Sequence, residues 1–239
     1  MRPLPAALLL SLALALPGRA QSLYGPGGLF LHPTASLPEK GTAAPAVLGL
    51  PQRNPRADAV RTWISGSVSY GLLEDLELGA TVVKVTNWDR DASAGGFVKW
   101  RALRESGGRP AVAVGFTGLG GGDVDTRQAF LALRRELGTV GDRRTVVGHL
   151  GAQYSDIVDG ISRHQVQPYA GLEVGLGGRL TFAAEGRPRM NREFGTPLAL
   201  TVVYRASRSL RLAVTWANNG MSGAPKFGFG AGYALGSRR

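Results

Sequence analysis

The chain contains no cysteine, so its three histidines are the residues best suited to acid–base or metal chemistry. The lack of a thiol excludes thiolate nucleophiles and thiolate metal ligands. His32, His149 and His164 lie far apart, without the short ligand spacing of a zinc site. The sequence therefore predicts no metal site and no cofactor.

Hydrolytic chemistry would need a nucleophilic serine beside a histidine that an Asp or Asn orients. Ser162 and His164 are separated by a single residue, but they fall in a segment that we expect to be a loop. His149 has no serine two residues further on, and neither Gly-x-Ser-x-Gly nor Gly-x-x-x-x-Gly-Lys occurs. We therefore expect no catalytic residues and a protein that is not an enzyme.

Binding chemistry is better represented, because polar and charged residues recur at every second position of several segments. Residues 165–176 show this most clearly. One face of this segment is apolar and consists of Val166, Pro168, Ala170, Leu172, Val174 and Leu176. The other face consists of Gln165, Gln167, Tyr169, Gly171, Glu173 and Gly175. Such alternation is typical of a β-strand with two different faces.

Twelve segments of the chain show this alternation and are separated by turn residues. They span 43–50, 61–72, 76–87, 92–102, 110–118, 126–137, 145–154, 165–176, 179–187, 198–205, 210–216 and 226–235. Short connections such as 73–75 alternate with longer ones such as 51–60. This pattern predicts an all-β fold, a transmembrane antiparallel up-and-down β-barrel of about twelve strands, with short turns at one end and long loops at the other.

The segment 127–137 also fits a helix, because Asp125 and Thr126 could cap it and Phe130, Leu133 and Leu137 would share one side. A helix there would leave eleven strands and break the alternation of turns and loops. We therefore expect a strand.

Residues 1–20 have the composition of a cleavable signal peptide. Arg2 precedes an apolar run of about eleven residues, too short to cross a bilayer as a helix, and Gly18 and Ala20 provide the small residues of a cleavage site. We expect 21–42 to form a Gly- and Pro-rich strap or plug at the mouth of the barrel, with His32 and Thr34 facing the lumen or packing, and 43–239 to form the barrel.

The apolar face of the strands is expected to meet lipid. A soluble lipocalin-like barrel or sandwich would bury that face instead. Small residues on the polar faces, such as the row Ser65, Ser67 and Ser69, fit a crowded interior better than a solvated surface. Aromatic residues gather near predicted strand ends, as in the girdles of membrane barrels: Tyr70, Trp88, Trp100, Tyr154, Tyr204, Trp216 and Tyr233.

The same alternation predicts which polar side chains line the lumen. Charges placed there can pair with one another and avoid lipid. The predicted lumen residues are Lys99, Arg101, His149, Gln153, Gln167, Tyr169, Glu173, Arg179, Glu185, Arg187, Arg205 and Arg211. They could form a salt-bridged filling or a selective binding wall.

The segment 27–42, Gly-Gly-Leu-Phe-Leu-His-Pro-Thr-Ala followed by Leu-Pro-Glu-Lys-Gly-Thr, resembles the opening of outer-membrane barrels of the YjbH kind. The phrase at 70–79, Tyr-Gly-Leu-Leu-Glu-Asp-Leu-Glu-Leu-Gly, resembles their recurrent hairpin. This resemblance implies a short, single-barrel member and a role in exopolysaccharide export or envelope assembly.

Three functions are compatible with these features. The first is a passive channel or conduit for small anionic or sugar-like solutes, because Arg and Gln would line the wall. The second is a structural barrel that binds glycan or a partner through its outer loops, which carry Asp89, Asp91, Asp123, Asp125, Asp156 and Asp159. The third, a membrane-embedded hydrolase, is the least favoured, because neither His149 nor His164 has the serine that such an enzyme would need on the barrel wall.

The charge of the chain points to anionic partners. The formal net charge is +11, of which Arg2 and Arg19 would leave with the signal peptide. Nucleic acid is not expected, because the chain would be exported and no aromatic and basic recognition motif occurs. Outer-membrane lipid and anionic glycan or polysaccharide are the expected partners.

Overall fold

The computed structural model describes residues 22, 25, 28–54, 59–87, 91–122, 124–139, 144–157, 165–189, 196–218 and 226–235. Several predictions lie outside this part of the chain, namely the signal peptide at 1–20, Ser162, His164, Trp88 and three of the six loop aspartates, Asp89, Asp123 and Asp159. No helix long and apolar enough to cross a membrane occurs among the described residues.

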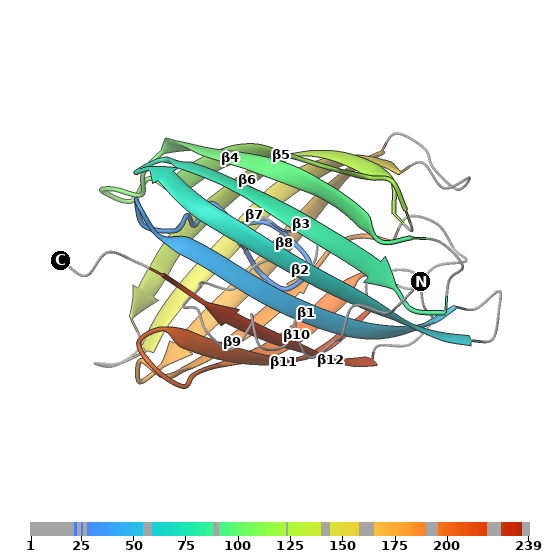
Figure 1. Ribbon diagram of the computed structural model, residues 1–239. Coiled ribbons are helices and arrows are strands. Elements are labelled where there is room, and N and C mark those ends of the chain that lie inside the picture. Colours follow the sequence, from blue (N-terminus) through green and yellow to red (C-terminus); the bar gives the residue numbers. More distant parts are fainter. Residues whose placement is uncertain are drawn as a thin grey trace.

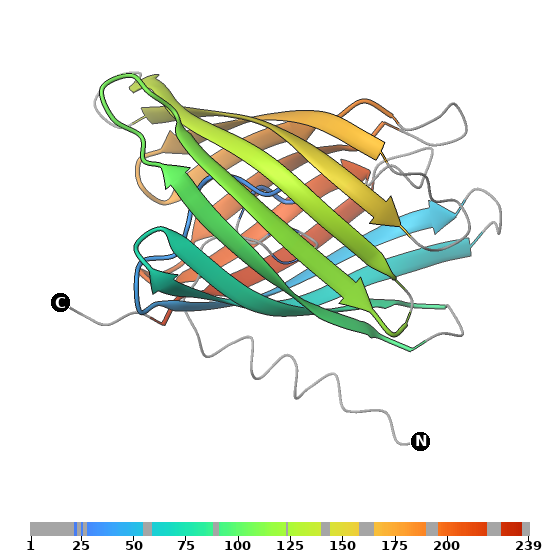
Figure 2. The same cartoon turned by 90° about the horizontal axis from the view of Figure 1, so that it is seen from above.

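Twelve strands form one closed antiparallel barrel (Figures 1 and 2). Each strand pairs with its neighbours in sequence, and the first and last strands close the wall. The strands are β1 (Ala43–Asn54), β2 (Ala59–Leu73), β3 (Leu76–Val85), β4 (Ser93–Leu103), β5 (Ala111–Gly120), β6 (Thr126–Thr139), β7 (Arg144–Ile157), β8 (Gln165–Leu176), β9 (Leu180–Gly186), β10 (Leu198–Arg205), β11 (Leu210–Asn218) and β12 (Lys226–Tyr233). This confirms the predicted up-and-down barrel.

The segment 127–137, for which a helix was the alternative, is part of strand β6. It pairs with β5 from Ala111 to Leu119 and with β7 along its whole length, so its backbone groups are satisfied by neighbours rather than within a helix. Helix propensity is a weak preference, and tertiary pairing overrides it here.

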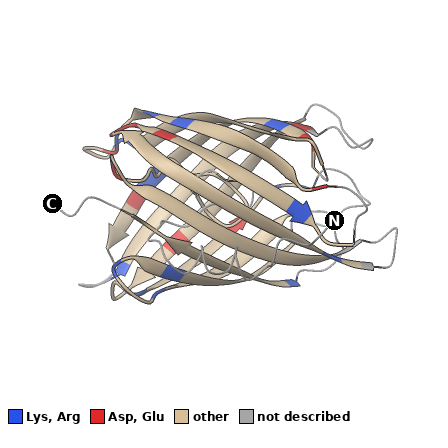
Figure 3. Ribbon diagram, viewed as in Figure 1, with Lys and Arg blue, Asp and Glu red and all other residues tan. Residues whose placement is uncertain are grey.

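The outer face of the barrel is a wide apolar surface, and charged residues lie mostly toward the two rims (Figure 3). Large exposed apolar side chains from nearly every strand form this face. Tyr70, Trp100 and Tyr204 are exposed near the short turns, and Tyr154 and Trp216 near the loops. An apolar band between two aromatic girdles is the surface that a transmembrane barrel presents to lipid.

The interior differs between the two ends of the barrel. We call these the turn end, which holds the connection between β2 and β3, and the loop end, which holds the connection between β1 and β2. Near the loop end, an apolar cluster lies inside the wall and includes Leu50, Trp63, Val83, Val85 and Leu119. Near the turn end, the interior is polar and contains a cavity.

Candidate functional site

The chain before β1 lies inside the lumen. We call residues 28–42 the N-terminal segment, and Figure 2 shows it threaded within the barrel. A tight turn joins the Leu29 N–H to the His32 carbonyl at 2.9 Å, and Gly28 pairs with Pro33 beside it. Phe30 and Leu31 of this turn belong to the apolar cluster near the loop end. The segment therefore enters the barrel, rather than only crossing its mouth.

Glu185 on β9 holds the tip of this segment. Its carboxylate accepts hydrogen bonds from the backbone N–H of Leu31 at 2.8 Å and of His32 at 3.1 Å. The same carboxylate lies 2.8 Å from Nδ1 of the His32 ring. All three contacts are buried, where charge-assisted hydrogen bonds are strong.

Tyr169 on the adjacent strand β8 also supports the segment. Its ring stacks on the His32 ring with centroids 4.8 Å apart, and its hydroxyl donates to the Pro33 carbonyl at 2.9 Å. Gly151 on β7 leaves room for Tyr169, because an added Cβ would lie 2.2 Å from the tyrosine ring.

Lys99 and Glu77 form a second attachment nearer the turn end. Their side chains are fully buried and 2.6 Å apart, and Lys99 Nζ also donates to the Ser36 carbonyl at 2.6 Å. A buried ammonium needs both a counter-ion and hydrogen-bond acceptors. The segment supplies one of those acceptors, so it completes this site.

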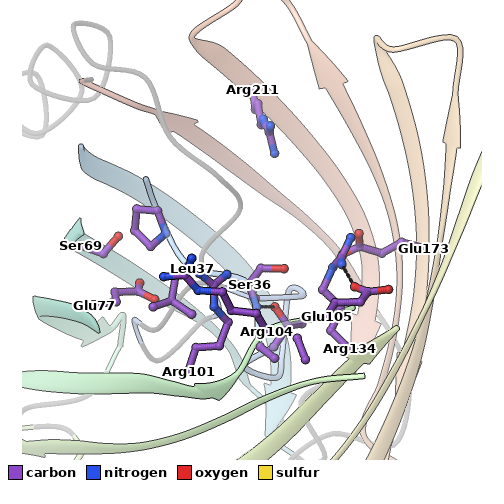
Figure 4. Close-up of a pocket in the computed structure, with 15 residues that line it drawn as sticks. Ser36, Leu37, Ser69, Glu77, Arg101, Arg104, Glu105, Arg134, Glu173 and Arg211 are labelled. Carbon is purple, nitrogen blue, oxygen red and sulfur yellow. Dashed lines mark hydrogen bonds and ion pairs between the residues drawn. The ribbon is translucent and has the colours of Figure 1, made fainter. Parts of the chain in front are cut away.

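A cavity of about 500 Å³ opens below these contacts at the turn end, and we call it the vestibule (Figure 4). Four arginines from β4, the β4–β5 turn, β6 and β11 line it, together with three glutamates and the N-terminal segment. The charged lining residues are Arg101, Arg104, Arg134, Arg211, Glu77, Glu105 and Glu173.

Ion pairs fix several of these guanidinium groups in place. Arg101 and Arg104 both bind Asp75 in the β2–β3 turn, at 2.7 Å and 2.5 Å. Arg134 binds Glu105, as the dashed line in Figure 4 marks. The hydrogen bond from Arg104 lowers the pKa of the Asp75 carboxyl below its usual value, partial burial opposes this, and Arg101 adds to the lowering.

The structure places the predicted lumen residues in three groups. Six are buried, and their side chains are inside the wall: Lys99, His149, Gln153, Gln167, Tyr169 and Glu185. Three line the vestibule: Arg101, Glu173 and Arg211. Arg187 is half-buried just after β9, whereas Arg205 is exposed at the end of β10 and Arg179 is exposed in the turn between β8 and β9. Arg179 therefore lies in a connection and not on the barrel wall.

Four charged vestibule residues are not among those that the sequence predicted: Glu77, Arg104, Glu105 and Arg134. Glu77 lies on the inward face of β3, where the alternation could have found it. Arg104 and Glu105 fall in a connection, where alternation gives no direction for a side chain. Arg134 shares the inward face of β6 with Gln128, so extending the alternation through the doubtful segment would have found it.

Comparisons with known proteins support the architecture. The KdgM porin structure aligns with a TM-score of 0.56 over 81% of this chain and 99% of that chain, at 12% identity. A second structure, KdgM porin in complex with disordered oligogalacturonate, aligns with a TM-score of 0.51 over the same shares, at 11% identity. No protein-family model and no curated protein matches the sequence. The barrel implied by the YjbH resemblance is confirmed, but membership of that family is not.

Proposed function

We propose that this protein is an outer-membrane channel for small anionic, sugar-like solutes. The observation that carries this proposal is the vestibule, where four arginines face three glutamates and one of these, Glu77, is already neutralised by Lys99. Each guanidinium has five N–H donors, and a carboxylate partner occupies only some of them. The remaining donors suit the carboxylates and hydroxyls of an acidic sugar.

The structural neighbours agree with this substrate class. The KdgM porin complex contains oligogalacturonate, an anionic sugar oligomer. At 11% identity this likeness is an analogy of fold, so the argument for substrate rests on the arginines of this chain.

The N-terminal segment limits what can pass. It lies in the lumen between the vestibule and the apolar cluster, so a path past it would be narrow and would suit only small solutes. The same observation favours a second candidate, a non-conducting structural barrel of the cell envelope that binds glycan or a partner through its outer loops. A role in exopolysaccharide export is compatible with both the channel and the structural barrel.

We place the turn end in the periplasm and the loop end outside the cell, after removal of residues 1–20 during export. The vestibule would then be the inner mouth, and the apolar cluster would lie near the outer one.

Liposome swelling with galacturonate and galactose tests the proposal, because these sugars have similar size and differ in charge. Galacturonate should enter faster, and Arg134→Gln with Arg211→Gln should remove that preference. Equal or faster entry of galactose into liposomes that carry the unaltered protein would contradict an anion-selective channel.

A further inference from the structure

Glu173 differs from the other two glutamates of the vestibule in its partner. Glu77 and Glu105 each pair with a lysine or an arginine, which carries a permanent positive charge. In the part of the chain that the structure describes, the partner of Glu173 is His149 on β7, whose ring Nε2 lies 3.5 Å from the carboxylate. A histidine is charged only when it is protonated. The charge of Glu173 is therefore compensated in one state of His149 and not in the other.

The two side chains differ in their access to the vestibule. The side chain of Glu173 is 32% exposed and lines the cavity, whereas that of His149 is only 1% exposed. Neither nitrogen of the His149 ring has a hydrogen bond to another described residue. The ring thus lies within the barrel wall, and the carboxylate beside it faces the cavity.

Two arginines lie near this pair, but neither forms an ion pair with Glu173 among the described residues. Arg134 on β6 stands beside His149 in the strand register, and its guanidinium pairs with Glu105. Figure 4 shows Arg134 and Glu173 on the same side of the vestibule. Arg211 on β11 lines the same cavity. The compensation of Glu173 within ion-pair distance thus depends on His149.

The other described neighbours of His149 supply no second counter-ion. Gly171 on β8 pairs with it in the strand register, and Leu29 of the N-terminal segment covers that glycine. Glu185 on β9 pairs with Gly171, and its carboxylate is held by the His32 ring and two backbone N–H groups. Glu173 is therefore the carboxylate that a proton on His149 compensates.

We propose that His149 and Glu173 set the selectivity of the vestibule by binding a proton. With His149 neutral, Glu173 adds a negative charge to the cavity and weakens its preference for anions. With His149 protonated, the two charges offset each other, and Glu173 no longer opposes the arginines. This proposal rests on the proposed channel, and it adds that acid strengthens the preference for anions.

The chloride-to-potassium permeability ratio, obtained from reversal potentials in asymmetric salt, tests the proposal. Histidines ordinarily exchange a proton between about pH 5 and 8, where most carboxylates stay ionised. From about pH 8 to about pH 5.5, the ratio of the unaltered protein should rise about twofold, because one negative charge of the cavity is offset. An equal ratio at both pH values would overturn the proposal.

Glu173→Gln is the sharpest variant, since the side chain is partly exposed and the change keeps its size. It should show the high ratio at both pH values, and His149→Gln should show the low one. His164→Gln is the matched control and should respond to pH as the unaltered protein does. Heat-modified migration on gels shows that each variant is folded. A full pH response in Glu173→Gln, or its loss in His164→Gln, would overturn the assignment to this pair.

A double-mutant cycle needs no conductance, so it separates this proposal from the channel itself. The coupling of His149→Gln with Glu173→Gln is measured in the free energy of unfolding, with guanidinium in detergent micelles. It should be present at about pH 5.5 and lost at about pH 8, since the two side chains attract as opposite charges only when His149 is protonated.

The outcomes distinguish the two proposals. Acid-dependent coupling in a barrel that does not conduct would contradict the channel and leave the proton-binding pair. A conducting barrel whose coupling is the same at both pH values would overturn the pair and leave the channel.

Discussion

Glu185 holds His32 by two groups at once, the backbone N–H at 3.1 Å and ring Nδ1 at 2.8 Å. The two residues are 153 positions apart, so this contact clamps the start of the chain to a strand near its end. This buried contact, together with those of Tyr169 and Lys99, sets the position of the N-terminal segment and with it the width of the lumen.

Glu185→Ala should release the N-terminal segment. It leaves two buried backbone N–H groups without an acceptor, at a cost of about 1–3 kcal/mol each. The segment then gains by leaving the lumen, and single-channel recordings should show larger conductance. Glu185→Gln keeps one carbonyl acceptor, so its conductance should lie between that of Glu185→Ala and that of the unaltered protein. Identical conductance in all three would show that the segment does not restrict the path.

Lys99→Met should destabilise the barrel by about 3–5 kcal/mol, because Glu77 would remain as a buried and uncompensated charge. Adding Glu77→Leu should recover most of this loss. Guanidinium unfolding of the refolded protein in detergent micelles measures both effects. If the double variant is no more stable than Lys99→Met, the loss of stability does not come from an uncompensated charge on Glu77.

Asp75 should make the β2–β3 turn sensitive to acid. Its pKa is lower in the folded barrel than the ordinary value of 3.8, so its contribution to stability is complete above that value and is lost as pH falls through the folded pKa. Unfolding midpoints measured from neutral pH downward should therefore fall below about pH 4. Asp75→Asn should be less stable at neutral pH, and its stability should depend less on acid. If its unfolding midpoint falls with pH as steeply as that of the unaltered protein, other carboxylates cause the acid dependence.

Leu172→Arg should block assembly into lipid, because Leu172 is exposed on the outer face and a charge there costs about 2–4 kcal/mol near the midplane. Ala183→Arg is the matched inward change, and it places the new cation opposite Glu173. Gly171 is a poor control, although it also points inward, since an added Cβ would lie 2.4 Å from Leu29. Equal assembly of the two variants, measured by heat-modified migration, would reverse the assignment of the faces.

The wall of the barrel could be predicted from the sequence because alternation is a local property. The predicted segment 165–176 has the same bounds as β8. Strands β6 and β7 run further than predicted, and pairing with each other supports the added residues. The ends of these strands are set by hydrogen bonds to the neighbouring strand. The β-propensity of a residue type does not contain that information.

The filling of the lumen could not be predicted in the same way. Leu50, Trp63 and Val85 point inward, although apolar residues were expected to face lipid. Phe30 and Leu31 provide their apolar partners, and that contact joins segments far apart in the chain. The contact of His32 with Glu185 is equally non-local, so the sequence suggested a strap or plug without showing what holds it.

The central claim is that the vestibule arginines select anions, and the reversal potential of single channels in asymmetric salt tests it most directly. The chain without residues 1–20, refolded into planar bilayers, should open in steps with an anion-preferring reversal potential. Arg134→Gln with Arg211→Gln should move that potential toward zero. Cation preference would contradict the selection of anions by the vestibule arginines. Silence, even in Glu185→Ala, would contradict the channel and leave the structural barrel as the better account.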